Sequence, residues 1–142
     1  MENTDLIGTW KLVSATATSS KGEWDGAPYG EGPSGFLTYT ADGRVTALIS
    51  YGGRKPLSMA PKVEEQAEAF KTSFAYAGTF SVTGDQVSHR IEVSTIQNFV
   101  NRDLVRTAKM DGDRLVLLTP PTPMNGKVQM VELTWQRLSA AS

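Results

Sequence analysis

Three polar side chains with useful chemistry lie within apolar, strand-like segments of this 142-residue chain: Tyr39, His89 and Arg106. Each has an apolar residue two positions away, and side chains two positions apart share a face of a strand. If those faces point inward, a phenol, an imidazole and a guanidinium meet in one interior. Such groups can move a proton, donate hydrogen bonds or polarise a carbonyl at a bound molecule. We therefore take all three as candidate catalytic residues.

The histidine is the only one in the chain, and it alternates with Val87 and Ile91. On an inward face, its neutral imidazole can exchange a proton with a ligand. The alternative is a structural histidine that is hydrogen-bonded to a neighbouring hydroxyl or carbonyl. Glu92 falls on the opposite face of the same strand, so we do not expect it to form an acid–base pair with His89.

Arg106 lies between Leu104 and Ala108 and shares their face. A guanidinium placed inside a protein needs a partner, because an uncompensated buried charge is costly. The partner is either an anionic or carbonyl-bearing ligand or a group within the chain. The candidate groups within the chain are Glu92, Glu132 and the face of Trp10.

Composition and spacing exclude several other kinds of chemistry. There are no cysteines, which rules out disulfides, thiolate nucleophiles and cysteine-bound metal. A single histidine and dispersed carboxylates predict no metal site, and we expect no cofactor. The glycines at positions 30 and 32 lack the strand-then-helix context of a dinucleotide site, and there is no Gly-x-Ser-x-Gly motif.

The charge pattern and the apolar runs limit the partners and the compartment. The formal net charge is −1 and the basic residues are scattered, so nothing favours nucleic acid as a partner. Apolar runs are too short for a membrane-spanning helix, and residues 1–5 do not look like a secretory signal. We expect a cytoplasmic protein that forms a single domain over residues 1–142. A homodimer is expected only from its general frequency.

Alternation predicts that most of the chain is β-strand. Residues 6–17 form the first strand, with Trp10, Leu12 and Ser14 on one face. Asp42-Gly43 between two alternating segments is a strong hairpin signal. The further predicted strands cover residues 79–82, 86–95, 103–110, 114–119 and 127–138, and the prolines at 120–123 interrupt the pattern.

One α-helix is predicted over residues 61–77, because apolar residues recur there every three or four positions. Pro61 suits its first turn, and Gly78 is expected to end it. Its apolar stripe should pack on the mouth or wall of the strand array. Because closure removes exposed strand edges, we predict an all-β fold, a closed antiparallel β-barrel of about eight to ten strands with this helix inserted.

Several segments resemble known proteins. Gly8-Thr9-Trp10 is similar to the Gly-x-Trp signature of lipocalin and calycin barrels, and Leu133-Thr134-Trp135-Gln136-Arg137 is similar to their closing strand. The resemblance implies that Arg137 packs over Trp10. Residues 6–13, 28–30, 35–43, 87–89 and 111–115 resemble small microbial lipocalin-like domains, and the resemblance runs from about residue 5 to residue 138. Residues 95–99 depart from it where a proline-containing turn is expected.

A barrel of this kind supports two main functions. The first is the binding of a small, mostly apolar or amphipathic metabolite in a central cavity, with the helix as a lid and the loop around Trp24 as a rim. The second is a cofactor-independent cyclase, isomerase or dehydratase acting on a polyketide- or terpenoid-like intermediate. In the second, His89 is the acid or base and Arg106 or a tyrosine polarises a carbonyl. A protein-interaction module with a patch at residues 120–123 is the weakest alternative. The expected ligand-binding residues are Trp10, Trp24, Leu37, Tyr51, Phe74, Tyr76, Asn98 and Trp135.

Overall fold

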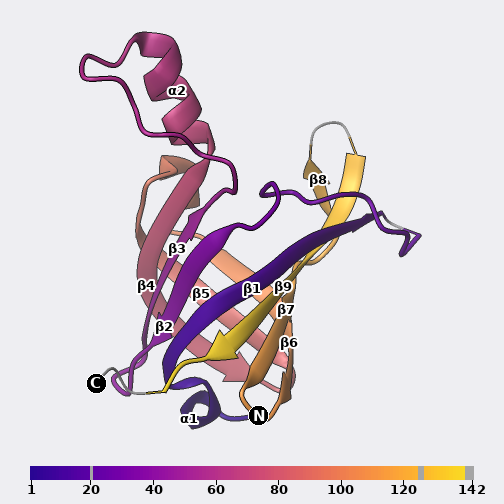
Figure 1. Cartoon of the computed structure of the whole chain (residues 1–142). Helices are drawn as coiled ribbons and strands as arrows, with labels where there is room; N and C mark the ends of the chain where they lie inside the picture. The colour runs from indigo at the N-terminus through magenta and orange to yellow at the C-terminus, as the bar shows by residue number, and fades with distance from the viewer. Residues whose placement is uncertain (20, 125–126, 140–142) are drawn as a thin grey trace.

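The computed structural model describes residues 1–19, 21–124 and 127–139. Figure 1 shows strands that wrap around a common axis, with one helix standing clear of them. In chain order the elements are α1 (Asn3–Leu6), β1 (Gly8–Ser19), β2 (Ser34–Tyr39), β3 (Arg44–Ser50), α2 (Val63–Lys71), β4 (Ser73–Thr83), β5 (Gln86–Ser94), η1 (Gln97–Phe99), β6 (Asp103–Asp111), β7 (Arg114–Leu118), β8 (Thr122–Met124) and β9 (Lys127–Arg137).

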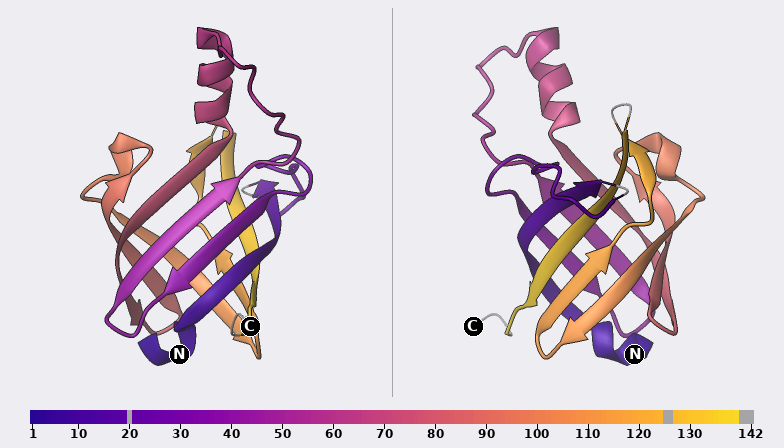
Figure 2. Two further views of the ribbon diagram at one scale, coloured as in Figure 1. Left: turned by 60° about the vertical axis from the view of Figure 1, so that its left-hand side comes forward. Right: turned by 90° about the vertical axis from the view of Figure 1, so that its right-hand side faces the viewer.

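These strands form a closed antiparallel barrel. The strands β1 to β7 pair in sequence order, β7 pairs with β9, and β9 pairs with β1 to complete the wall. The short β8 pairs only with the first residues of β9, so eight strands make up the barrel. Figure 2 shows the strands slanting around the wall, as closure requires. The predicted fold class is confirmed, although the proline-rich segment leads into β8 where an interruption was expected.

The hairpin of β2 and β3 shows why the strands take this register. Tyr39 pairs with Val45 across the turn, and Asp42-Gly43 lies within that turn, with Gly43 at φ 84°. Leu37, Tyr39 and Val45 are fully buried, whereas the intervening residues face outward. The alternation in the sequence therefore specifies the face that packs inside.

The face predicted for β1 is correct only for its first half. Trp10 and Leu12 are buried, but Ala15 is buried and Ser14 is exposed. The register between β1 and β9 shifts between Leu12 and Ser14, which places one extra residue in β1. Such a β-bulge reverses the alternation beyond it, and strict period-2 counting cannot anticipate it.

The predicted helix at residues 61–77 is too long. Helix α2 ends at Lys71, and residues 73–83 form β4, which pairs with β3 and β5. Phe74 fits both a helical stripe and a strand alternation, and pairing on both sides favours the strand. Gly78 lies inside β4 opposite a bulge in β5, where a Cβ would come 1.7 Å from the Arg90 carbonyl oxygen.

The expectation that the helix packs on the barrel is also wrong. Figure 1 shows α2 projecting from the upper end of the barrel, and none of its residues is buried. Val63 and Phe70 of the predicted apolar stripe are 76% and 55% exposed. Helix α2 therefore does not cover the barrel mouth as a lid.

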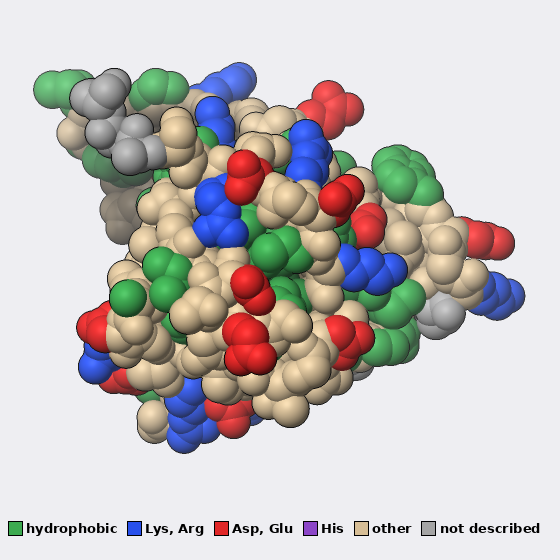
Figure 3. All heavy atoms as spheres, turned by 90° about the horizontal axis from the view of Figure 1, so that it is seen from below, with side chains coloured by type: hydrophobic (Ala, Val, Ile, Leu, Met, Phe, Trp, Pro, Cys, Tyr) green, Lys and Arg blue, Asp and Glu red, His purple; other side chains and the backbone are tan. Residues whose placement is uncertain are grey.

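The opposite end of the barrel is closed by α1 and by Trp10. Leu6 and Trp10 are completely buried there, and the indole Nε1 of Trp10 donates to the Leu6 carbonyl at 2.9 Å. The Arg137 guanidinium lies 4.2 Å from the centre of the Trp10 ring, as the family resemblance implied. Figure 3 views the molecule from this end, where acidic and basic side chains are interspersed.

Candidate functional site

The chain's only histidine lies at the centre of a buried hydrogen-bonded cluster of three residues from three strands. His89 is 1% exposed, in line with the complete burial of its neighbours Val87 and Ile91 on β5. The hydroxyl of Tyr39 on β2 lies 2.7 Å from Nε2 of His89. The hydroxyl of Tyr76 on β4 lies 2.7 Å from Nδ1. Both ring nitrogens are therefore occupied.

These two hydrogen bonds give partners to the imidazole nitrogens and the tyrosine hydroxyls, which are polar groups buried inside the barrel. A buried imidazole needs partners for both nitrogens, and each tyrosine hydroxyl needs one too. The ring of Tyr39 also packs edge-on against Phe80, with ring centres 4.6 Å apart. The Tyr39–His89–Tyr76 chain is thus held by packing as well as by hydrogen bonds.

The surroundings keep Tyr39, His89 and Tyr76 uncharged. Burial, with the nearby positive charge of Arg106 as a second cause, lowers the pKa of His89 to about 3. Burial raises the pKa of Tyr76 to about 12, with Arg106 acting in the opposite direction. Burial likewise raises the pKa of Tyr39 well above its ordinary value. At neutral pH the imidazole carries one proton and both phenols keep theirs.

A cavity of about 220 Å³ lies inside the barrel beside this chain. It is at the end from which α2 projects, where β3 ends and β4 begins. Most of its wall is aliphatic or aromatic, as is usual for small-molecule sites. The lining residues are Tyr29, Leu37, Ala47, Ile49, Tyr51, Phe74, Tyr76, His89, Ile96, Phe99, Leu104, Arg106, Leu117, Leu133 and Trp135.

Arg106 lines the cavity and is only partly exposed. Its Nη1 donates to the carbonyl of Val105 at 3.2 Å, and it takes part in no ion pair among the described residues. Two of the partners considered for Arg106 are engaged elsewhere. Glu92 pairs with Arg44 at 3.2 Å, and the face of Trp10 is covered by Arg137. The guanidinium thus lies at the cavity wall, and no carboxylate of the described residues pairs with it.

The structure brings together most of the residues predicted from the sequence. Along with His89 and Arg106, the cavity is lined by five of the expected ligand-binding residues, namely Leu37, Tyr51, Phe74, Tyr76 and Trp135. The indole nitrogen of Trp135 is buried and has no hydrogen-bond partner among the described residues. Tyr39 is not part of the lining, so it reaches the cavity only through His89.

Three other expected ligand-binding residues lie outside the cavity. Trp10 belongs to the closed end of the barrel. Trp24 is 73% exposed, because its segment forms a single bridge to Thr18 on the edge of β1 and does not fold inward. Asn98 is exposed on η1. These assignments are corrected accordingly.

The sequence prediction missed two apolar residues close to Asn98. Ile96 and Phe99 both line the cavity, and the 3₁₀-helix η1 at Gln97–Phe99 replaces the proline-containing turn expected there. Ile96 and Phe99 are three positions apart, and in a 3₁₀ turn this spacing places two side chains on the same side. The spacing was the signal in the sequence that could have identified them as lining residues. Tyr29 was also missed as a lining residue. Its ring centre lies 5.1 Å from that of Tyr51 and 5.6 Å from that of Phe74.

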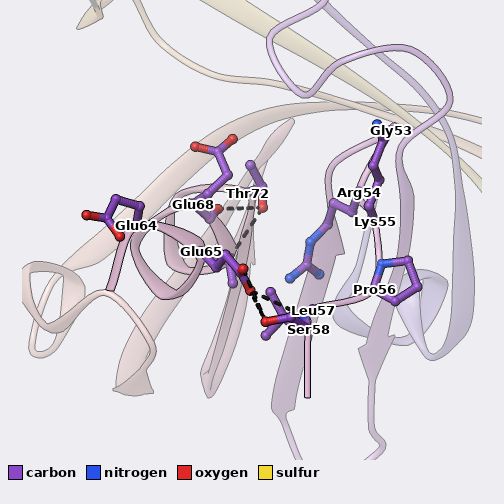
Figure 4. A pocket seen from close by; sticks show the side chains of 12 residues that line it. Gly53, Arg54, Lys55, Pro56, Leu57, Ser58, Glu64, Glu65, Glu68 and Thr72 are labelled. Carbon is purple, nitrogen blue, oxygen red and sulfur yellow. Dashed lines mark hydrogen bonds between the residues drawn. The ribbon is translucent and has the colours of Figure 1, made fainter. Parts of the chain in front are cut away.

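A second, more open hollow lies outside the barrel between α2 and the segment that precedes it. This groove has a volume of about 720 Å³, and Figure 4 shows the carboxylates of Glu64, Glu65 and Glu68 on its helical side. Ser58 hydrogen-bonds to Glu65 across it at 2.9 Å, and Arg54 donates to Ser50 at 2.7 Å. Charged side chains line the groove, whereas the walls of the interior cavity are mostly aliphatic and aromatic.

Among the described residues, no three histidine or acidic side chains cluster closely enough to hold a metal ion. None of the helices in the described ranges is long and apolar enough to cross a membrane.

Comparison with known protein families shows the family to which this chain belongs. A family model described as a lipocalin-like domain matches residues 7–138, a range that includes all the strands of the barrel. The chain belongs to the lipocalin-like domain family. No curated protein matches it. The family assignment confirms the resemblance seen in the sequence, and it is consistent with a barrel that holds a small molecule.

Proposed function

We propose that this lipocalin-like barrel binds a small, mostly apolar metabolite in its interior cavity. The observation that carries the proposal is the hollow of about 220 Å³ inside the barrel, in which aliphatic and aromatic walls surround a few polar groups. Apolar surface that leaves water on entering such a hollow favours binding, and the polar groups orient the guest. Family membership supports the same function.

The size of the cavity limits the ligand. A cavity of about 150 Å³ is enough to hold benzene, and sites for drug-sized ligands begin at roughly 300 Å³. The cavity here lies between the two, which suits a molecule of one or two rings. The tyrosines at its mouth, Tyr29 and Tyr51, contact each other and bound the space available to the guest.

The binding proposal is tested by filling the cavity. Ala47 lines it from β3, and its neighbour Thr46 faces outward on the same strand. Ala47→Phe should therefore abolish the rise in melting temperature that 1-methylnaphthalene produces in the wild type, whereas Thr46→Phe should retain it. Native mass spectrometry of freshly purified protein should detect a retained small molecule in wild type and Thr46→Phe only. Equal responses from both variants would contradict a binding site in the interior.

A second candidate function is cofactor-independent catalysis, as a cyclase, isomerase or dehydratase of specialised metabolism. The observation in its favour is the Tyr39–His89–Tyr76 chain beside a cavity that also contains Arg106. With both nitrogens of His89 occupied, the group that meets the substrate is Tyr76. Its pKa of about 12 keeps it protonated, so it polarises a carbonyl as a hydrogen-bond donor. Loss of turnover in Tyr76→Phe, with ligand affinity retained, would separate catalysis from binding.

A further inference from the structure

The Tyr39–His89–Tyr76 chain has a direction that can be worked out from its burial. A neutral imidazole has one N–H donor and one bare nitrogen that accepts. One tyrosine must therefore donate its hydroxyl proton to the ring, and the other must accept the ring proton. The tyrosine that accepts keeps its own O–H free for a different partner.

Burial decides which tyrosine donates to the ring. Tyr39 is 1% exposed, does not line the cavity, and has only Nε2 of His89 as a hydroxyl partner among the described residues. If Nε2 carried the proton, the O–H of Tyr39 would be left without an acceptor in the interior, which is costly. Tyr39 therefore donates to Nε2, and the imidazole proton is on Nδ1.

The direction of the chain then determines what the cavity offers. Nδ1–H donates to the oxygen of Tyr76, so the hydroxyl proton of Tyr76 is not used by the chain. Tyr76 lines the cavity, where this proton is available to a guest. His89 and Tyr39 thus make Tyr76 a donor toward the ligand, and Tyr39 acts as a positioning residue that never contacts it.

Arg106 adds a positive charge to the same cavity. Arg106 pairs with Val87, two residues before His89, and it lines the same cavity as Tyr76 and His89. Its positive charge acts to lower the pKa values of both groups. None of the lining residues is an aspartate or a glutamate, and Arg106 has no ion-pair partner among the described residues. A guest with an oxyanion would neutralise this charge and accept the Tyr76 proton.

We propose that the cavity selects small apolar anions, ring-sized hydrocarbons with one carboxylate, whose oxygens accept hydrogen bonds from Tyr76 and Arg106. This inference rests on the proposed binding function and specifies the chemistry of the ligand. The hydrocarbon part lies against the aliphatic and aromatic walls, and the carboxylate lies at the polar side of the cavity.

The test compares four probes of nearly equal size by calorimetric titration at pH 7. These are 1-naphthoate, 1-naphthalenemethanol, 1-naphthylmethylamine and 1-methylnaphthalene. The carboxylate should bind about tenfold or more tightly than the alcohol, because hydrogen bonds to a charged group are the stronger ones. The ammonium should bind most weakly. If the hydrocarbon or the alcohol binds as well as the carboxylate, the inference is wrong and the binding function stands. If none of the probes binds, both are wrong.

Variants assign the preference to the named residues. Arg106→Met should bring the carboxylate down to the affinity of the alcohol. Arg90→Met makes the same charge change on the exposed face of β5 and should leave the preference intact. Arg106→Gln is a second, more polar replacement if the first does not fold. A preference that survives loss of the Arg106 charge would overturn the assignment.

The direction of the hydrogen bonds in the Tyr39–His89–Tyr76 chain can be measured separately. Nitrogen-15 spectra of His89 should show a protonated Nδ1 and a bare Nε2 in the wild type. Tyr39→Phe removes the donor to Nε2, so the ring no longer has to keep its proton on Nδ1. The affinity for 1-naphthoate should then fall several-fold, while that for 1-methylnaphthalene stays the same. A protonated Nε2 in the wild type, or an equal loss for both probes, would contradict the proposed direction.

Discussion

Lowering the pH from 7 to 5 should destabilise this protein chiefly through one side chain. His89 is the only histidine, and histidine is the side chain whose ordinary pKa falls in this range. In the folded protein burial lowers its pKa to about 3, compared with 6.5 for an exposed group. Between these two values the unfolded chain binds a proton that the folded chain does not bind, so stability is present above pH 6.5 and is lost as the pH falls.

The loss of stability between pH 7 and pH 5 can be calculated from the ordinary pKa of histidine in the unfolded chain alone. At pH 5 the unfolded imidazole is almost fully protonated, while the folded one is still neutral. The free energy of unfolding should therefore be lower at pH 5 than at pH 7 by ~2 kcal/mol. Because this figure needs only a folded pKa well below 5, it is insensitive to the exact value. Carboxylates contribute less, since their ordinary pKa values lie below this range.

Urea unfolding at the two pH values measures the difference. The matched variant is His89→Gln, which can still hydrogen-bond to both tyrosines but does not titrate. The variant is expected to lose most of the difference between pH 7 and pH 5, whatever its absolute stability. A wild-type difference below about 0.5 kcal/mol, or an equal difference in the variant, would refute the argument. In the wild type, proton spectra of the His89 ring should show no titration from pH 8 to 5.

Three further predictions concern the scaffold and can be checked by urea unfolding at pH 7. Arg137→Met removes the cation–π contact with Trp10 and the hydrogen bonds to two backbone carbonyls of residues 5 and 7, and it should lower stability by about 1–3 kcal/mol. Gly78→Ala should lower the free energy of unfolding by about 3 kcal/mol or more, because the added Cβ meets a carbonyl oxygen. Gly84→Ala should lower it by only about 1 kcal/mol, because residue 84 has a positive φ of 61° but open space around it. Phe70→Ser should change stability by less than about 0.5 kcal/mol, because Phe70 is 55% exposed on a helix with no buried residue.

Much of the barrel was predictable because alternation is a local property. The hairpin at Asp42-Gly43 and the inward faces of β2, β3 and β5 follow from residues close together in sequence. The errors lie where a distant strand decides the outcome. The bulge in β1 depends on its register with β9, and the strand conformation of residues 73–77 depends on pairing with β3 and β5.

The site was predictable to the level of faces but not of contacts. Burial of His89 follows from its alternation with Val87 and Ile91. That two tyrosines from two other strands would occupy both of its nitrogens could not be predicted, because it depends on how β2, β4 and β5 are arranged around the barrel. The same is true of Arg106, because its lack of an ion-pair partner within the described ranges depends on the assembled interior.

The pairing of β9 with β1 constrains how the molecule folds during synthesis. The wall cannot close until residues near position 137 have left the ribosome, so the nascent chain holds an open, curled sheet with two unpaired edges. Closure of the barrel must therefore wait until β9 has emerged, and it should take the millisecond-to-second time typical of folds rich in distant contacts. During that interval the chain depends on dilution or on chaperones to avoid joining the edges of its neighbours.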